Sequence, residues 1–118
     1  MQGFSLVTIV ETPEFLASAS KFLHEDERAA LVDYLAYNPL AGAVIAGTGG
    51  VRKLRWGLEG RGKRGGARVI YFYRRTDLPL FILTAYAKNV RENLTQADKN
   101  DFKRLTKLLA DNYGRAKR

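Results

Sequence analysis

The most constraining feature of this sequence is the run Gly60–Tyr73, GRGKRGGARVIYFY, in which a basic glycine-rich segment leads directly into apolar and aromatic residues. The β-branched and aromatic residues of Arg68–Arg74 predict a strand rather than a helix. Two nucleotide-binding patterns occur by letter around the start of this segment, GxxxxGK over Gly57–Lys63 and GxGxxG over Gly60–Gly65. Both patterns bind phosphate next to a helix that follows them, so a strand in that place argues against nucleotide binding. Arg64 also stands where a P-loop requires Ser or Thr.

Two further strands are predicted beside this one, over 51–56 and 79–88, and a fourth over 4–11. The connection between the strands ending at Arg74 and beginning at Pro79 is short, which favours antiparallel pairing. The segment Pro39–Gly50 is rich in small residues and is predicted to be a loop packed over a sheet edge.

Three helices complete the predicted fold. Thr12 and Pro13 are a typical helix start, and this helix is expected to run to about Phe22. A second helix is expected from His24 to Tyr37, so that the two form a helical hairpin. Thr95-Gln96-Ala97-Asp98 resembles a capping box and predicts a C-terminal amphipathic helix. We therefore predict a single α+β domain over residues 1–118, a small antiparallel sheet with an N-terminal helical hairpin and a C-terminal helix, with the helices on one face.

The charge of the chain is concentrated in one region. Residues 51–75 contain nine cations and the single acid Glu59, so this region alone accounts for the net charge of +8. A local excess of this kind is typical of a protein that binds a phosphate-rich partner, although a basic sheet edge that prevents aggregation is the simpler alternative.

Several kinds of chemistry have no support in the sequence. The chain has no cysteine, which excludes thiol chemistry and disulfides and fits a cytoplasmic protein. His24 is the only histidine and is expected at a helix start, and the carboxylates form no ligand cluster, so we predict no metal and no cofactor. No long apolar run is present, the N-terminus does not resemble a signal peptide, and we expect no membrane partner.

Strand alternation predicts which side chains can act together. Arg68, Ile70, Phe72 and Arg74 should share one face of the sheet. Lys53 and Arg55 should lie together beside Val51, and Tyr86 and Lys88 beside Thr84 and Ile82. One face can therefore gather a set of cations and an aromatic ring: Lys53, Arg55, Arg68, Tyr86 and Lys88.

Such a set suits the cleavage of RNA. RNA carries its own nucleophile, the 2′-OH, so a cleaving protein needs only to remove that proton, stabilise the charged phosphate and protonate the leaving 5′-oxygen. Arginine offers a bidentate donor for the phosphate, and lysine can act as an acid, or as a base where neighbouring cations depress its pKa. Tyrosine can stack on a base or relay a proton.

Three blocks together carry a family resemblance: GTGGVRKLRWG (Gly47–Gly57), GKRGGARVIYFY (Gly62–Tyr73) and FILTAYAKN (Phe81–Asn89). In this order they closely resemble the RelE-type toxins of bacterial toxin–antitoxin modules, and most of all their HigB-like branch. The resemblance covers nearly the whole chain. It implies a ribosome-dependent mRNA endonuclease that is neutralised by a cognate antitoxin, often a helix-turn-helix protein, with operator DNA bound only through that antitoxin.

The resemblance also suggests roles for single residues. Arg68 matches the family arginine thought to bind the scissile phosphate, and Lys53 with Arg55 matches an alternating basic pair that is usually lysine–lysine. Lys88 lies near a basic residue proposed as the general acid. The family's C-terminal tyrosine has no clear match, and Tyr86 is a candidate substitute. The cations expected to bind RNA around this centre are Arg52, Arg61, Lys63 and Arg64.

Two other functions remain open at this point. The chain can be a non-catalytic RNA- or ribosome-binding module with the same basic sheet. It can also be an inactive relative of the toxins that is kept for antitoxin pairing and regulation of the operon. The intact basic residues in all three blocks favour catalysis.

Overall fold

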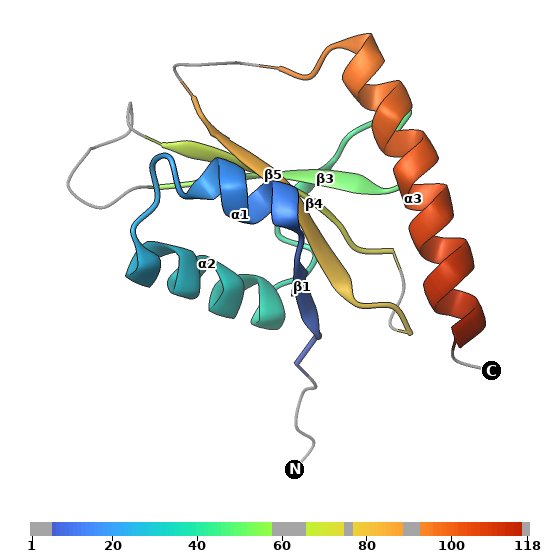
Figure 1. The fold of residues 1–118 in the computed structure, drawn as a ribbon, viewed down its shortest axis with the longest axis horizontal. Coiled ribbons are helices and arrows are strands. Elements are labelled where there is room, and N and C mark those ends of the chain that lie inside the picture. Colours follow the sequence, from blue (N-terminus) through green and yellow to red (C-terminus); the bar gives the residue numbers. More distant parts are fainter. Residues whose placement is uncertain (1–5, 58–65, 75–76, 89–92, 117–118) are drawn as a thin grey trace.

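The computed structural model describes residues 6–57, 66–74, 77–88 and 93–116, with side chains described up to Tyr113. Three helices surround one five-stranded sheet (Figure 1). The strands are β1 (Ile9–Glu11), β2 (Ala43–Val44), β3 (Val51–Trp56), β4 (Ala67–Phe72) and β5 (Leu80–Ala87). The helices are α1 (Pro13–Ala19), α2 (Glu25–Tyr37) and α3 (Gln96–Ala116). The predicted α+β class with an N-terminal helical pair and a C-terminal helix is confirmed.

The sheet has the strand order β1-β5-β4-β3-β2 and is antiparallel except for one pair. β1 runs parallel to β5, with Ile9 opposite Leu80, whereas β5, β4, β3 and β2 pair antiparallel in sequence. β3 has the predicted bounds. β1 is shorter than the strand predicted over 4–11. β2 lies within Pro39–Gly50, which the sequence predicts to be a loop, and it contributes just two residues to the sheet edge.

The helix starts follow the predicted capping chemistry. The Thr12 hydroxyl accepts a hydrogen bond from the amide of Phe15 (3.1 Å), and Pro13 occupies the first turn of α1. At the start of α3, the Thr95 hydroxyl accepts from the Asp98 amide (3.0 Å) while the Asp98 carboxylate accepts from the Thr95 amide (2.9 Å). His24 is exposed at the N-cap of α2, as expected for a surface or capping histidine.

The helices cover both faces of the sheet, so the expectation that they lie on one face is wrong. Figure 1 shows α3 well apart from the α1–α2 pair. On one face, α1 and α2 bury Phe15, Leu31 and Leu35 against strand residues such as Val69 and Tyr71. On the other face, Phe102, Leu105 and Leu109 of α3 pack on Val51, Ile70, Phe72, Phe81 and Leu83. The apolar residues of α3 recur at helical spacing and require a partner face, which is the second side of β4 and β5.

A hydrogen bond outside the apolar contacts fixes α3 along the sheet. The buried hydroxyl of Thr106 lies 3.0 Å from the carbonyl oxygen of Thr48, in the turn before β3, and donates to it. Gly49 makes this approach possible, since its φ is +80° and a Cβ at this position would lie 2.6 Å from the Thr106 hydroxyl oxygen. The turn before β3 is therefore shaped to receive α3.

Replacing Gly49 by alanine should destabilise the docking of α3, and Gly47 provides a matched control. Gly47 has nearly the same φ, +79°, but a Cβ added there would meet no heavy atom within 4 Å. Gly47→Ala should therefore cost only the backbone strain, about 1–2 kcal/mol. Gly49→Ala should cost measurably more free energy of unfolding in denaturant titrations. Equal losses for the two variants would show that the contact with Thr106 does not constrain this turn.

Candidate functional site

The candidate site is a row of side chains that crosses the three central strands. In the register of the sheet, Arg55 of β3 lies opposite Arg68 of β4, and Arg68 lies opposite Tyr86 of β5. Neighbouring strands are about 4.8 Å apart, so the backbones of Arg55 and Tyr86 are separated by about 10 Å. The structure therefore brings these three predicted residues together.

A β-bulge decides which way Tyr86 points. The register shifts so that Ile70 faces Thr84 while Tyr71 faces Ile82, which leaves Leu83 as an extra residue in β5. As a result Ile82 packs with α1 and α2, whereas Tyr86 packs on the α3 face together with the residues around Arg68. The prediction that Tyr86 shares a face with Ile82 is thus wrong, since simple alternation takes no account of the bulge. The predicted faces for β4, with Ile70 and Phe72 on one side and Val69 and Tyr71 on the other, are confirmed.

Lys53 and Lys88 flank the row on its two sides. Lys53 lies two residues before Arg55 on β3, opposite Ile70. Its ammonium lies 3.4 Å from the side-chain oxygen of Asn93. Lys88 follows β5, two residues after Tyr86. Its amide donates to the carbonyl of Gly66 (3.0 Å), two residues before Arg68. The backbone thus places two amine side chains, which can exchange protons, on either side of two guanidinium groups, which cannot.

Arg68 is the most buried charged residue in the described part of the chain, with 7% of its surface exposed. Among the described residues, no carboxylate lies within ion-pair distance of it, and its cross-strand neighbour Arg55 carries the same charge. A buried cation without a counter-charge is unfavourable for folding. An anion bound between Arg55 and Arg68 would supply this counter-charge.

Arg52 lies away from this row. It stands opposite Tyr71, whose ring packs with α1 and α2, and its guanidinium donates to the carbonyl oxygen of Gly42 (2.7 Å). Here it supports the segment between α2 and β2, together with the buried Tyr71 hydroxyl, which donates to Pro39 (2.8 Å) and accepts from the Gly42 amide (2.8 Å). Burial raises the pKa of Tyr71. The other predicted RNA-binding cations, Arg61, Lys63 and Arg64, lie outside the described residues.

The groove beside the row has the wrong charge for a phosphate. It encloses about 610 Å³ between α1, β5 and α3, and its charged lining residues are the acids Glu14, Asp98 and Asp101. Tyr86 also lines this groove. An RNA strand is therefore expected on the open basic row rather than in this groove.

No group of three or more His, Asp or Glu residues in the described part of the chain is arranged to hold a metal ion. None of the helices described is both long and apolar enough to cross a membrane.

Comparison with known families decides the relationship. The family described as RelE toxin of the RelE/RelB toxin–antitoxin system matches residues 39–116, which is more than half of the chain. The chain belongs to the RelE toxin family. The match begins just after α2 and contains β2 to β5 and α3, so every residue of the basic row lies within it. RelE-family toxins generally cleave mRNA, and membership implies an antitoxin partner.

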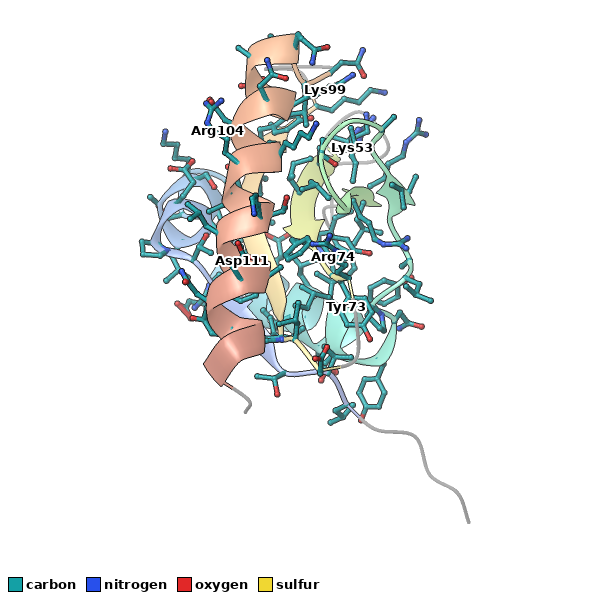
Figure 2. The ribbon with its side chains drawn as sticks, turned by 90° about the vertical axis from the view of Figure 1, so that its right-hand side faces the viewer. Lys53, Tyr73, Arg74, Lys99, Arg104 and Asp111 are labelled. Carbon is teal, nitrogen blue, oxygen red and sulfur yellow. The ribbon has the colours of Figure 1, made fainter. Side chains whose placement is uncertain are left out.

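The sequence analysis missed two cations that the RelE fold brings to this face. Lys99 and Lys103 belong to α3, outside the basic region of residues 51–75. Figure 2 shows Lys99 and Lys53 on the same side of the molecule, from α3 and from the sheet. Their signal was present in the sequence, because Lys99, Lys103 and Thr106 are spaced at four and three residues along one side of an amphipathic helix.

The like charges of the row should cost stability. Directly opposed like charges in a sheet are destabilising, and relieving them is worth about 0.2–1 kcal/mol. Arg55→Thr, which keeps a good strand residue, should therefore raise the free energy of unfolding at low salt, and the gain should shrink at high salt because the repulsion is screened.

Lys21→Thr is the control for this experiment, since Lys21 is exposed in the turn after α1 and its replacement removes the same charge. The measurement is the denaturant midpoint at low and high ionic strength. A destabilised Arg55→Thr variant at low salt, or a gain that Lys21→Thr reproduces, would contradict the repulsion across the row.

Proposed function

We propose that this RelE-family toxin is an mRNA endoribonuclease that acts on the ribosome and cleaves translated message through attack by the RNA's own 2′-OH. The observation that carries the proposal is the buried Arg68, which has no ion-pair partner among the described residues and lies between Arg55 and Tyr86 in the row that crosses the sheet. The three sequence blocks that resemble the HigB-like branch support a place in that branch, with an antitoxin of helix-turn-helix type and cytoplasmic action. Operator DNA would then be contacted only through the antitoxin.

Arg68 and Arg55 would bind the scissile phosphate. Guanidinium groups donate paired hydrogen bonds to phosphate oxygens, and a partly buried arginine does so where water competes poorly. The phosphate gains negative charge as it becomes pentacoordinate, so donors held in place by the sheet stabilise the transition state more than the bound substrate. The bidentate geometry requires arginine at position 68, because lysine offers only a point charge.

The proton transfers fall to the two lysines. One base removes the proton from the 2′-OH, the 2′-oxygen bonds to phosphorus, and the bond from phosphorus to the 5′-oxygen breaks as that oxygen receives a proton. The products are a 2′,3′-cyclic phosphate and a 5′-hydroxyl. We assign these transfers to Lys53 and Lys88, which lie on the two sides of the row, and base stacking to Tyr86. This chemistry needs no metal ion, since the nucleophile and the leaving group belong to the RNA itself.

Replacing Arg68 tests the proposal directly. Expression of the wild type in growing cells should arrest growth and create new RNA 5′ ends inside translated codons. Arg68→Ala should remove both effects, since loss of a phosphate donor in a preorganised site costs about 2–4 kcal/mol of transition-state stabilisation. Arg68→Lys should recover only part of the activity.

Arg74→Ala is the matched control, because Arg74 follows the same strand but is exposed and outside the row. It should retain most of the cleavage. Growth arrest by the wild type without new cuts would favour a non-catalytic ribosome-binding protein. Equal cleavage by wild type and Arg68→Ala would exclude the assigned phosphate site.

A further inference from the structure

The charged side chains of α3 are divided between two flanks of the helix. Lys99, Lys103 and Thr106 follow one another at spacings of four and three residues and so share a flank. Thr106 marks the direction of this flank, because its hydroxyl bonds to Thr48 directly before β3. The opposite flank carries Asp98 and Asp101, which line the groove beside α1. The half-buried Lys99 and the exposed Lys103 therefore lie on the flank that meets the turn before β3, and these acids lie on the flank beside α1.

Ion pairing follows the same division. Two of the exposed cations of α3 are neutralised within the helix, Arg104 by Asp101 and Lys107 by Asp111. In the part of the chain that the structure describes, no carboxylate lies within ion-pair distance of Lys99 or Lys103. Within these described ranges, the helix thus pairs Arg104 and Lys107 and leaves Lys99 and Lys103 without a counter-charge.

The flank of α3 that carries Lys99 and Lys103 lies along the basic row. Lys99 is seven residues before Thr106, so it is displaced by about 10 Å along the helix axis toward the N-terminal end of α3. At this end the Lys53 ammonium reaches Asn93, three residues before the helix. Figure 2 shows Lys53 on the sheet and Lys99 on the helix at the same end of the molecule. Lys53 and Lys99 are both half-buried and carry the same charge. Their repulsion is unfavourable in the absence of an anion between them.

We propose that Lys99 and Lys103 form the second wall of the RNA site and bind the phosphate backbone of the strand that is cleaved, beside the scissile phosphate at Arg68. This rests on the proposed endoribonuclease function. Phosphate contacts fix the position of a strand but carry no base information. The flank of α3 therefore adds affinity and alignment without adding codon preference.

The test compares two double variants with the same loss of charge on the same helix. Lys99→Gln/Lys103→Gln removes the two cations without a counter-charge, and Arg104→Gln/Lys107→Gln removes the two that are ion-paired within the helix. Binding is measured as a function of salt with a single-stranded oligoribonucleotide that is 2′-O-methylated throughout and hence cannot be cleaved. Loss of two phosphate contacts should lower the slope of log affinity against log salt by about 1.4, from about 0.7 for each contact on a single strand.

A second arm identifies the RNA that is contacted. Pelleting with ribosomes that lack message should be the same for the Lys99→Gln/Lys103→Gln protein and the wild type. A lowered slope for this variant alone supports the proposal. Equal slope changes in both double variants would show a bulk charge effect and overturn it. Weaker ribosome pelleting with an unchanged oligonucleotide slope would also overturn it, since the flank would then bind ribosomal RNA.

Cleavage of translated message by the wild type is scored in parallel and separates the two claims. If the wild type cleaves but the slopes do not differ, the α3 contact is wrong and the endoribonuclease stands. If the wild type never cleaves but the slopes differ as expected, the strand contact stands and the endoribonuclease is wrong. Thermal unfolding of both double variants checks that each is folded.

Discussion

The opposition of Arg55 and Arg68 across β3 and β4 is the constraint on which the account of this site depends. A sheet register is set by its buried face, since a slip of one residue turns every side chain over. Here Val51 and Leu54 of β3, and all six residues of β4, are buried, so the register cannot relax to separate the two arginines. The apolar packing of the sheet therefore imposes an electrostatic cost at one position. Proteins tolerate such local costs mainly at functional sites.

The helices on the two faces contribute differently to that position. α1 and α2 fill one side of the sheet with apolar side chains, and the Glu11–Arg28 ion pair (2.5 Å) joins β1 to α2. α3 covers the other side only in part: its apolar residues pack on Ile70 and Phe72, while Arg55 at the end of the row remains exposed. The same helix provides both the cover of the second core and a cationic flank beside the row. Any movement of α3 would thus change the site, and the hydrogen bond from Thr106 to Thr48 holds it in place.

Much of this fold could be predicted from the sequence because its signals are local. The strand Val51–Trp56, the Thr12 and Thr95 helix caps and the failure of the two nucleotide motifs all follow from residues within a few positions of one another. The bulge at Leu83 could not be predicted, since it depends on how β5 fits β4 and not on the residues of β5 alone. The parallel pairing of β1 and the place of α3 on the second face are likewise tertiary, long-range features. The site shows the same division: Arg55, Arg68 and Tyr86 were expected together, whereas Lys99 was missed because only the packing of α3 brings it to β3.

The chemical ends of the cleaved RNA test the central claim most directly. If the RelE-family row cleaves by attack of the 2′-OH, message cut by the wild-type toxin must end in a 5′-hydroxyl and a 2′,3′-cyclic phosphate, or the 3′-phosphate formed by its hydrolysis. A single 2′-deoxynucleotide at the cut position should then abolish cleavage there. Products with a 5′-phosphate and a 3′-hydroxyl, or cleavage that persists at the deoxynucleotide, would contradict the account, since water and not the RNA would then be the nucleophile.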